Sequence, residues 1–425
     1  MGSVFNAVAS ITASLVNSKN QKKTMKKIRE INATNRNLSF VGKVSVDSII
    51  PLNCQVGNIC VSGGEPDIRR SLIVQNVKQS VSTGMPVIIL HEGNYHLEHE
   101  LSNSCFGQNY LRIINTNNPF YDPIYRLNND DAARLIVEAS LDEHKIDTSG
   151  VLYLRALNEL LRKKGITPYL RMMASCPHNS IQSIIVQEEQ SSVISSNEAV
   201  AIRNDIIAGM NARSSIEYYF SRIQSEADIV AWKSHLSRST SIAECIKRGG
   251  IIVIDVGSIN KQSQISLIVA ELKSCISQGI SCRLIVDAKS IAGCKRIVEL
   301  LKNSTSMLLW TLSTPDLGSF SGTTREELAT WLALSHKTIL FSHSIYTAEQ
   351  LSAELGDYEH IEVTQSHAGN NNIGQFGFHF GSTNNLTTTN KRERVIKPEE
   401  ILNLNVSEFL ILDNNTASLA KGVVI

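Results

Sequence analysis

The chain has 425 residues, and at about 100–200 residues per domain it is long enough for two or three domains with ample cores. Hydrophobic residues make up 42% and charged residues 19%, a balance typical of globular proteins that excludes a wholly disordered chain. The formal net charge is +1, so no overall field draws the protein to nucleic acid or membrane, and any basic surface must be local.

The N-terminal segment, residues 1–35, carries apolar residues at helical spacing and then a run of basic ones. Val4, Val8, Ile11 and Leu15 precede the lysines and arginine of residues 19–29. This pattern predicts an N-terminal helix with a basic arm, which either packs with a solvated basic face or docks on a membrane, a protein partner or nucleic acid.

Two features predict a cytoplasmic protein. No stretch reaches the roughly 18 consecutive apolar residues that a bilayer-spanning helix needs. The eight cysteines are scattered and lack Cys-x-x-Cys spacing, which favours reduced thiols. Peripheral contact with the inner membrane through residues 1–30 is compatible with both features.

Strands and helices alternate in the first and last parts of the chain. Residues 58–62 read as a strand, Gly63-Gly64 as a turn, and residues 71–81 as a helix, followed by a second buried strand at 85–90. The same alternation returns with strands predicted at 251–255, 283–287, 307–311 and 338–341. Continuous apolar strands separated by helices predict an α/β fold with a mostly parallel sheet flanked by helices.

The middle of the chain differs in its predicted secondary structure, because residues 127–245 contain one helical pattern after another. We therefore expect an inserted all-helical domain at 127–245, within an α/β domain built from residues 36–126 and 246–425. The Asn- and Gly-rich stretch 367–374 predicts an exposed loop before a late hairpin.

The turn after the first buried strand is where nucleoside-triphosphate proteins place Gly-x-x-x-x-Gly-Lys-Ser/Thr. Here the residues run from Gly64 to Ser71, with Arg69 at the second glycine and Arg70 at the lysine. Arg70 keeps a cation and Ser71 keeps the hydroxyl that binds Mg²⁺. Pro66 lacks an N–H to donate, and Glu65 and Asp67 place carboxylates where an anion would sit, so the pattern favours a plain strand-turn-helix.

A second motif of such proteins is a strand that ends in an aspartate, which holds Mg²⁺, and a glutamate that activates water. Asp287 ends an apolar strand, but Ala288 occupies the position of the glutamate and cannot act as a base. The segment ending at Asp255 has the same outline, so either aspartate can simply terminate a strand.

His91, His96 and His99 lie close in sequence and suggest a metal cluster. Their spacing is not His-Glu-x-x-His, and a position directly after a strand predicts a loop, so a surface cluster without metal is the simpler interpretation.

The ordered segments together resemble the type IV secretion coupling proteins, the conjugative DNA-translocating ATPases of the RecA-like ring-motor class. The likeness covers most of residues 36–425. It runs through the segment 64–71, the strand and turn at 84–93, Tyr121 to Ile124, and the strands around 249–258 and 284–288. It ends in the segment 391–402 and the strand at 409–412.

The resemblance implies a RecA-like nucleotide-binding domain with an inserted helical domain that recruits substrates, and ATP with Mg²⁺ as the ligands. Gly64, Arg70, Ser71 and Asp287 are the positions that match its nucleotide site. The chain departs from the family at Arg69-Arg70 and Ala288, lacks the glutamine expected after the strand at 307–311, and has no membrane-spanning helix.

These departures predict a pseudo-ATPase that works as a binding or assembly subunit of a type IV secretion or conjugation machine. It would join a homo- or hetero-oligomeric ring or recruit proteins or DNA–protein complexes. One alternative is an active ATP-driven DNA translocase that uses Arg70, Ser71 and Asp287. A second is a metal-dependent hydrolase built on His91, His96 and His99, and a third is an assembly element that binds neither DNA nor nucleotide.

Overall fold

The computed structural model describes residues 20–104, 111–140, 145–231, 238–257, 261–289, 295–320, 324–374 and 377–425. The chain divides into two compact units: unit 1 comprises residues up to Lys43 and Phe341–Val424, and unit 2 comprises Val44–Leu340 with Ile425. The helix predicted from residues 4–16 lies outside the described residues.

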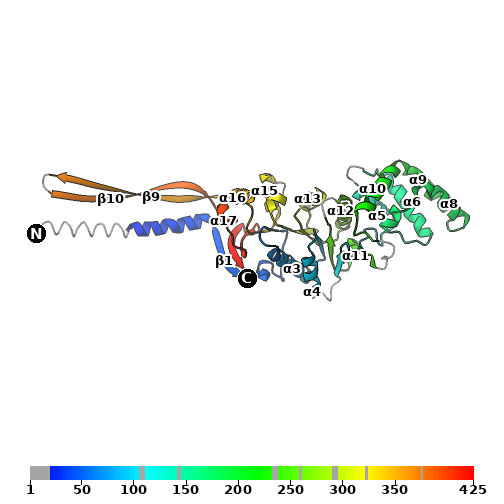
Figure 1. The fold of residues 1–425 in the computed structure, drawn as a ribbon, viewed down its shortest axis with the longest axis horizontal. Coiled ribbons are helices and arrows are strands. Elements are labelled where there is room, and N and C mark those ends of the chain that lie inside the picture. The colour runs from blue at the N-terminus through cyan, green and yellow to red at the C-terminus, as the bar shows by residue number, and fades with distance from the viewer. Residues whose placement is uncertain are drawn as a thin grey trace. The chain divides into compact units, whose positions relative to one another are not determined.

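Unit 2 is built on a parallel sheet with the strand order β8-β2-β7-β6-β3-β5-β4. The central strands β2, β3 and β5 are buried along their whole length, which is the pattern expected when helices cover both faces, whereas the edge strand β4 is only partly buried. Helices α3 and α4 lie on one side of this sheet, and α12 and α13 on the other (Figure 1). The strands are β2 (Ile59–Ser62), β3 (Val87–His91), β4 (Leu111–Ile114), β5 (Ile251–Asp255), β6 (Cys282–Asp287), β7 (Leu308–Thr314) and β8 (Lys337–Leu340).

The core of unit 2 forms where α3 packs on the sheet, and Ile73, Val77, Ile89, Val253 and Ile285 are all fully buried there. The helices around the sheet are α2 (Val46–Ile49), α3 (Pro66–Ser82), α4 (Tyr95–Asn103), α11 (Ile242–Lys247), α12 (Gln262–Ser277), α13 (Lys295–Lys302), α14 (Leu317–Phe320) and α15 (Arg325–Leu334).

Helices fill the chain between β4 and β5. They are α5 (Asn129–Ala139), α6 (Gly150–Lys163), α7 (Leu170–Ala174), α8 (Ile181–Gln190), α9 (Ser196–Ala208) and α10 (Arg213–Glu226), with short 3₁₀ turns at His178–Ser180 and Met210–Ala212. Apolar residues of α6 recur at helical spacing and are buried, including Leu154, Leu157 and Leu161.

The chain leaves the sheet for these helices at Tyr121 and returns beside the same residue, because Tyr121 forms isolated parallel bridges with Val230 and Thr240. The Tyr121 hydroxyl donates to Glu271 Oε2 at 2.7 Å, and the N–H of Ala243 donates to Glu271 Oε1 at 2.8 Å. Burial raises the pKa of Glu271 to about 8 against the opposing effect of these bonds. A buried carboxyl therefore ties the root of the helical segment to α12 and α11.

Unit 1 contains a helix over residues 20–36 and a long antiparallel hairpin of β9 (Asp357–Gly374) and β10 (Gly377–Arg394). Its other strands are β1 (Leu38–Val44), β11 (Glu408–Asp413) and β12 (Ser418–Val424), where β11 and β12 pair antiparallel. Its remaining helices are α16 (Ile345–Glu354) and α17 (Pro398–Leu402).

The prediction of a loop at residues 367–374 is wrong, since these residues form the C-terminal part of β9, with Ile373 opposite Phe378. Asn and Gly are poor strand formers, but a continuous antiparallel partner satisfies their backbone groups, and that pairing overrides local propensity.

The predicted fold class is confirmed: the chain is α/β, with a mostly parallel sheet flanked by helices. Among the described residues, no helix combines the length and the apolar character needed to cross a bilayer.

Candidate functional site

The candidate site lies at the carboxyl edge of the unit 2 sheet, where open parallel sheets bind their ligands. Register places Ser62 of β2 beside Thr314 of β7, and Asp287 of β6 beside Ser313. His91 of β3 lies between Asp287 on one side and Asp255 of β5 on the other. The polar residues at the ends of these strands therefore lie in one row along the edge of the sheet.

The turn between β2 and α3 is short. Strand β2 ends at Ser62 and α3 begins at Pro66, which leaves Gly63, Gly64 and Glu65 as the connection. Both glycines have positive φ, 81° and 66°, a conformation that other residues adopt at a cost. Pro66 is pre-organised for the first helical turn, so the helix begins five residues before the predicted start at Ser71.

The early helix start changes the roles of Arg69, Arg70 and Ser71, because all three lie within α3 and not in a loop. A phosphate loop binds by curling many backbone N–H groups around the anion. The three-residue turn here leaves few such groups outside the helix.

Arg69 folds back over the turn. Its Nη1 donates to the carbonyl oxygens of Gly63 at 3.0 Å and Gly64 at 2.6 Å, and the residue is 6% exposed. Burial lowers the pKa of Arg69, and the nearby charges of Asp287 and Glu65 oppose that shift. The turn thus presents carbonyl oxygens to a cation, which is the opposite polarity to an anion-binding loop.

Arg70 and Ser71, which the resemblance placed at the nucleotide site, also bind protein groups. Arg70 Nε donates to Glu100 at 2.7 Å, and its Nη2 lies 3.0 Å from Asp67. The Ser71 hydroxyl donates to the backbone carbonyl of Asp67 at 3.0 Å, a local bond within the helix.

Asp287 accepts two side-chain hydrogen bonds that the sequence did not reveal. Ser313 Oγ donates to its Oδ1 and Asn94 Nδ2 to its Oδ2, each at 2.7 Å. Asn94 also caps α4, since its side chain accepts from the N–H of Leu97. An Asn directly before a helical pattern is a recognisable cap signal, whereas its contact with Asp287 depends on the fold.

The position after Asp287 carries no base, because Ala288 is buried and offers only a methyl group. An acidic contact comes from the turn after β3, where Glu92 Oε2 accepts from the N–H of Lys289 at 2.8 Å. A carboxylate from a neighbouring strand end therefore reaches the segment that follows Asp287.

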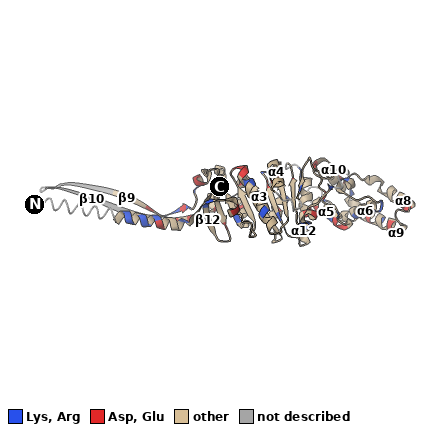
Figure 2. Cartoon of the chain, turned by 90° about the horizontal axis from the view of Figure 1, so that it is seen from below, with Lys and Arg blue, Asp and Glu red and all other residues tan. Residues whose placement is uncertain are grey.

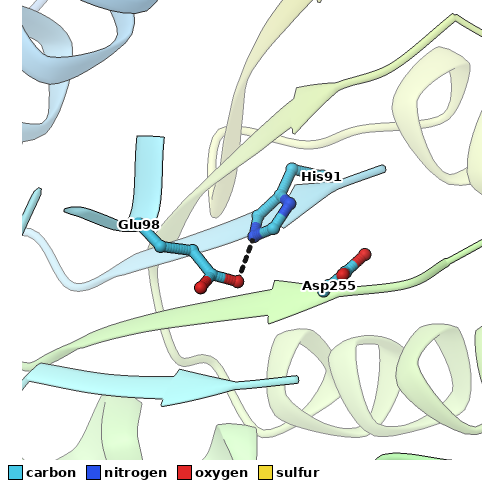
Figure 3. A group of neighbouring side chains, drawn as sticks. All are labelled: His91, Glu98 and Asp255. Carbon is cyan, nitrogen blue, oxygen red and sulfur yellow. Dashed lines mark ion pairs between the residues drawn. The ribbon is translucent and has the colours of Figure 1, made fainter. Parts of the chain in front are cut away.

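The three histidines do not form a cluster. His96 and His99 are exposed on α4, whereas His91 is fully buried at the end of β3. Figure 3 shows that His91 faces Glu98, with Nε2 and Oε1 3.2 Å apart, and that Asp255 lies nearby. The metal site of His91, His96 and His99, which the sequence left as an alternative, is thus not assembled in this structure. The expectation of a surface cluster is wrong for His91, because this residue ends a strand inside the sheet.

His91, Glu98 and Asp255 each place one ligand atom within 4.8 Å of the others, which is close enough to surround a cation. The N–H of Asn94 donates to His91 Nδ1 at 3.1 Å, whereas His91 Nε2 and Glu98 Oε1, which face each other, are buried and make no hydrogen bond within the described part of the chain.

Two other atoms of this cluster bind protein groups. Asn115 donates to Glu98 Oε2 at 2.9 Å, and the N–H groups of Gly93 and Gly257 each donate to Asp255 Oδ1 at 3.0 Å. The cluster therefore fixes α4 and the turns after β3 and β5.

No protein-family model and no curated protein matches the sequence. The fold matches solved structures of a bacterial conjugative coupling protein, TrwB. An unbound monoclinic form of TrwBdeltaN70 aligns with a TM-score of 0.50 and 16% identity, over 87% of this chain and 84% of that one. TrwB in complex with the non-hydrolysable GTP analogue GDPNP aligns with a TM-score of 0.51 and 16% identity, over 94% and 91%. VirB4 of Thermoanaerobacter pseudethanolicus aligns with a TM-score of 0.44 and 11% identity, over 87% and 89%.

This chain has a coupling-protein fold. The resemblance stated from the order of its segments is confirmed at that level.

Proposed function

We propose that the protein is a coupling-protein-like subunit of a type IV secretion or conjugation machine, and that it acts by binding and assembly without effective ATP hydrolysis. The fold supports the first part. The single observation that carries the second is Arg69, whose guanidinium binds the carbonyls of the turn where a phosphate would have to sit.

The chemistry of phosphoryl transfer explains why this observation matters. Catalysis there comes from positioning and from stabilising charge on the transferred phosphoryl group. A triphosphate would meet the carboxylates of Glu65 and Asp67 at the start of α3, and the cation of Arg70 is shared with Asp67 and Glu100. The residues present do not fit ATP with Mg²⁺, so we assign no hydrolytic step to them.

The binding role follows from what the fold keeps. The partners proposed are related subunits of a homo- or hetero-oligomeric ring, and substrate proteins or DNA–protein complexes. The helical segment at 127–245 is the proposed recruiting surface, by its resemblance to the inserted domain of coupling proteins.

A calorimetric titration with ATP and Mg²⁺ tests the proposal. We expect no saturable heat up to about 1 mM ATP. This result corresponds to a binding free energy weaker than about 4 kcal/mol. Arg70→Ala should behave as the wild type, and Arg126→Ala is a matched control, since Arg126 is an exposed arginine in an ion pair with Glu244. Tight binding that Arg70→Ala abolishes and Arg126→Ala preserves would contradict the proposal.

One observation favours a second candidate, an active DNA translocase. Glu92 reaches the backbone of Lys289, so a base from the turn after β3 can stand in for the missing glutamate at Ala288. DNA-stimulated phosphate release that Glu92→Gln removes, with Glu299→Gln unaffected, would establish this activity.

Binding of a short DNA duplex at two salt concentrations separates a DNA-handling subunit from a purely structural one. Phosphate contacts release counterions, so true DNA binding weakens steeply as salt rises. A subunit that binds neither DNA nor nucleotide would show no binding at either concentration.

A further inference from the structure

We propose that His91, Glu98 and Asp255 form a structural binding site for one divalent cation with the ligand preference of Zn²⁺. The site differs from the cluster of three histidines considered from the sequence, because only His91 belongs to both. It also excludes Ser71 and Asp287, two of the positions that match the nucleotide site of the coupling proteins. The proposal therefore holds whether or not the protein binds nucleotide.

The first argument is the charge that the fold buries at this point. Glu98 of α4 is 8% exposed and Asp255 of β5 is 6% exposed. Elsewhere in unit 2 many carboxylates pair with Lys or Arg, and the two kinds of charge are interspersed over its helices (Figure 2). Within the described residues neither Glu98 nor Asp255 forms such a pair, and the single ionic contact is that of Glu98 with His91. Buried charges are paired or coordinate metals, and a divalent cation would balance these two carboxylates.

The second argument is the pair of atoms that face each other in Figure 3. His91 Nε2 and Glu98 Oε1 are buried, 3.2 Å apart, and without a hydrogen bond in the part of the chain that the structure describes. Two ligands at zinc bond lengths of about 2.0–2.2 Å and the tetrahedral angle lie about 3.4 Å apart, so this separation suits one shared cation. Asp255 has a ligand atom within 4.8 Å of both, and it has to approach by at most about 1.4 Å to share the same cation.

Hydrogen bonds hold the other side-chain atoms of the three residues in place, as outer partners do in metal sites. The N–H of Asn94 binds His91 Nδ1 at 3.1 Å, and Asn115 binds Glu98 Oε2 at 2.9 Å. Two backbone N–H groups bind Asp255 Oδ1 at 3.0 Å. The outer nitrogen of a ligand histidine usually donates a hydrogen bond, whereas Nδ1 of His91 accepts one. We therefore expect a dissociation constant of about 1–10 µM and not the tighter binding of a zinc finger.

A cation at this point would brace the candidate site beside it. It would join the end of β3, helix α4 and the end of β5 through one ligand from each. Asn94 connects it to Asp287, because the N–H of Asn94 binds His91 and its Nδ2 binds Asp287 Oδ2 at 2.7 Å. All three ligand residues are more than nine-tenths buried, so the cation is closed to substrate and its role is structural, not hydrolytic.

The test titrates the full-length chain, first freed of metal by a chelator, with Zn²⁺ and with Co²⁺, whose visible absorption reports its ligands. We expect one cation per chain and a rise in unfolding temperature of about 3–5 °C at saturation. Mg²⁺ should give no response, because it prefers oxygen ligands alone. The Co²⁺ spectrum should lack the intense band of thiolate ligands, which excludes binding by the cysteines. Glu98→Gln keeps an oxygen for Asn115 and should weaken binding about tenfold or more.

The matched control combines His96→Gln with His99→Gln, at the two exposed histidines of the same helix, and should bind as the wild type. Asp255→Asn is a second ligand variant, in case Glu98→Gln does not fold, and circular dichroism checks the fold of each protein. The proposal is overturned if the wild type binds neither cation, or if a folded ligand variant binds as tightly as the wild type. Loss of binding in the control, or a thiolate band in the Co²⁺ spectrum, would place the cation elsewhere and overturns it as well.

Discussion

The buried carboxyl of Glu271 gives the protein a stability that should fall as pH rises. Glu271 is 1% exposed, and burial raises its pKa from 4.5 to about 8. Between those two values the folded state keeps a proton that the unfolded state has released. The free energy of unfolding must therefore decrease as pH rises through this window.

The size of the effect follows from linkage, at about 1.4 kcal/mol for each unit of pKa difference. Integrated between about pH 5 and pH 9, a shift of this size removes about 4 kcal/mol of stability. Asp122 adds to the loss, because its burial raises its pKa to about 7, against the effect of the N–H groups of Leu170 and Ile124.

Glu271→Gln isolates the effect. The amide keeps an oxygen for the N–H of Ala243 and offers its NH₂ to the Tyr121 hydroxyl, so the local contacts survive while the titration is lost. We expect the variant to lose less stability than the wild type between pH 5 and pH 9, by about 4 kcal/mol.

The assay is urea denaturation at several pH values, followed by the fluorescence of Trp310 and Trp331, which are buried in unit 2. Glu299→Gln, at an exposed carboxyl of the same unit, serves as the control and should keep the wild-type pH dependence. If Glu271→Gln retained the full wild-type slope, the reasoning about the buried carboxyl would be refuted.

Substitutions at three positions test individual contacts. Arg69→Ala removes two hydrogen bonds from a buried cation and should cost about 2–3 kcal/mol in urea denaturation, with Arg69→Lys recovering part of it; a loss below about 0.5 kcal/mol would show that the turn does not need the guanidinium. Asn94→Ala removes the cap of α4 and a bond to Asp287 and should cost about 1–2 kcal/mol, whereas Asn94→Asp keeps the cap but opposes Asp287; equal stability of wild type and both variants would contradict this. Asn32→Ala removes both bonds to Ile361, so trypsin should cleave the helix at 20–36 several-fold faster; an unchanged rate would show that these bonds do not hold it.

The parallel sheet was predictable because its strands carry their signal locally. Residues 251–254 and 284–286 are short apolar runs that are each followed by aspartate, and a strand buried on both faces needs such a run. Burial of the whole run in each strand explains why the fold class could be inferred without a contact map.

The start of α3 shows where sequence reasoning went wrong for a reason present in the sequence itself. Helical periodicity of the apolar residues placed the helix start at Ser71, whereas Pro66 and Asp67 are strong signals for a helix that begins at residue 66. The first turn of α3 lacks the apolar periodicity, so only its proline and its acidic residue mark it as helical.

The contacts of the site depend on long sequence separations. Asn94 and Asp287 are 193 residues apart, and nothing in the sequence around either residue indicates that the two are in contact. Likewise the partner of His91 is Glu98 and not either nearby histidine, because α4 turns Glu98 inward and leaves His96 and His99 outside. Which face of a short helix packs on the sheet is decided by tertiary structure.

A single physical cause connects the stability of the turn with its poor fit to nucleotide. A loop built to hold phosphate leaves its N–H groups without protein partners, so it is complete only when the anion is bound. In this chain Arg69 satisfies the carbonyls of Gly63 and Gly64, and Ser313 and Asn94 satisfy Asp287. The carbonyls of this turn and the carboxylate of Asp287 therefore already have protein partners. A nucleotide would have to break these bonds before it could make its own, and that cost adds to the repulsion from Glu65 and Asp67.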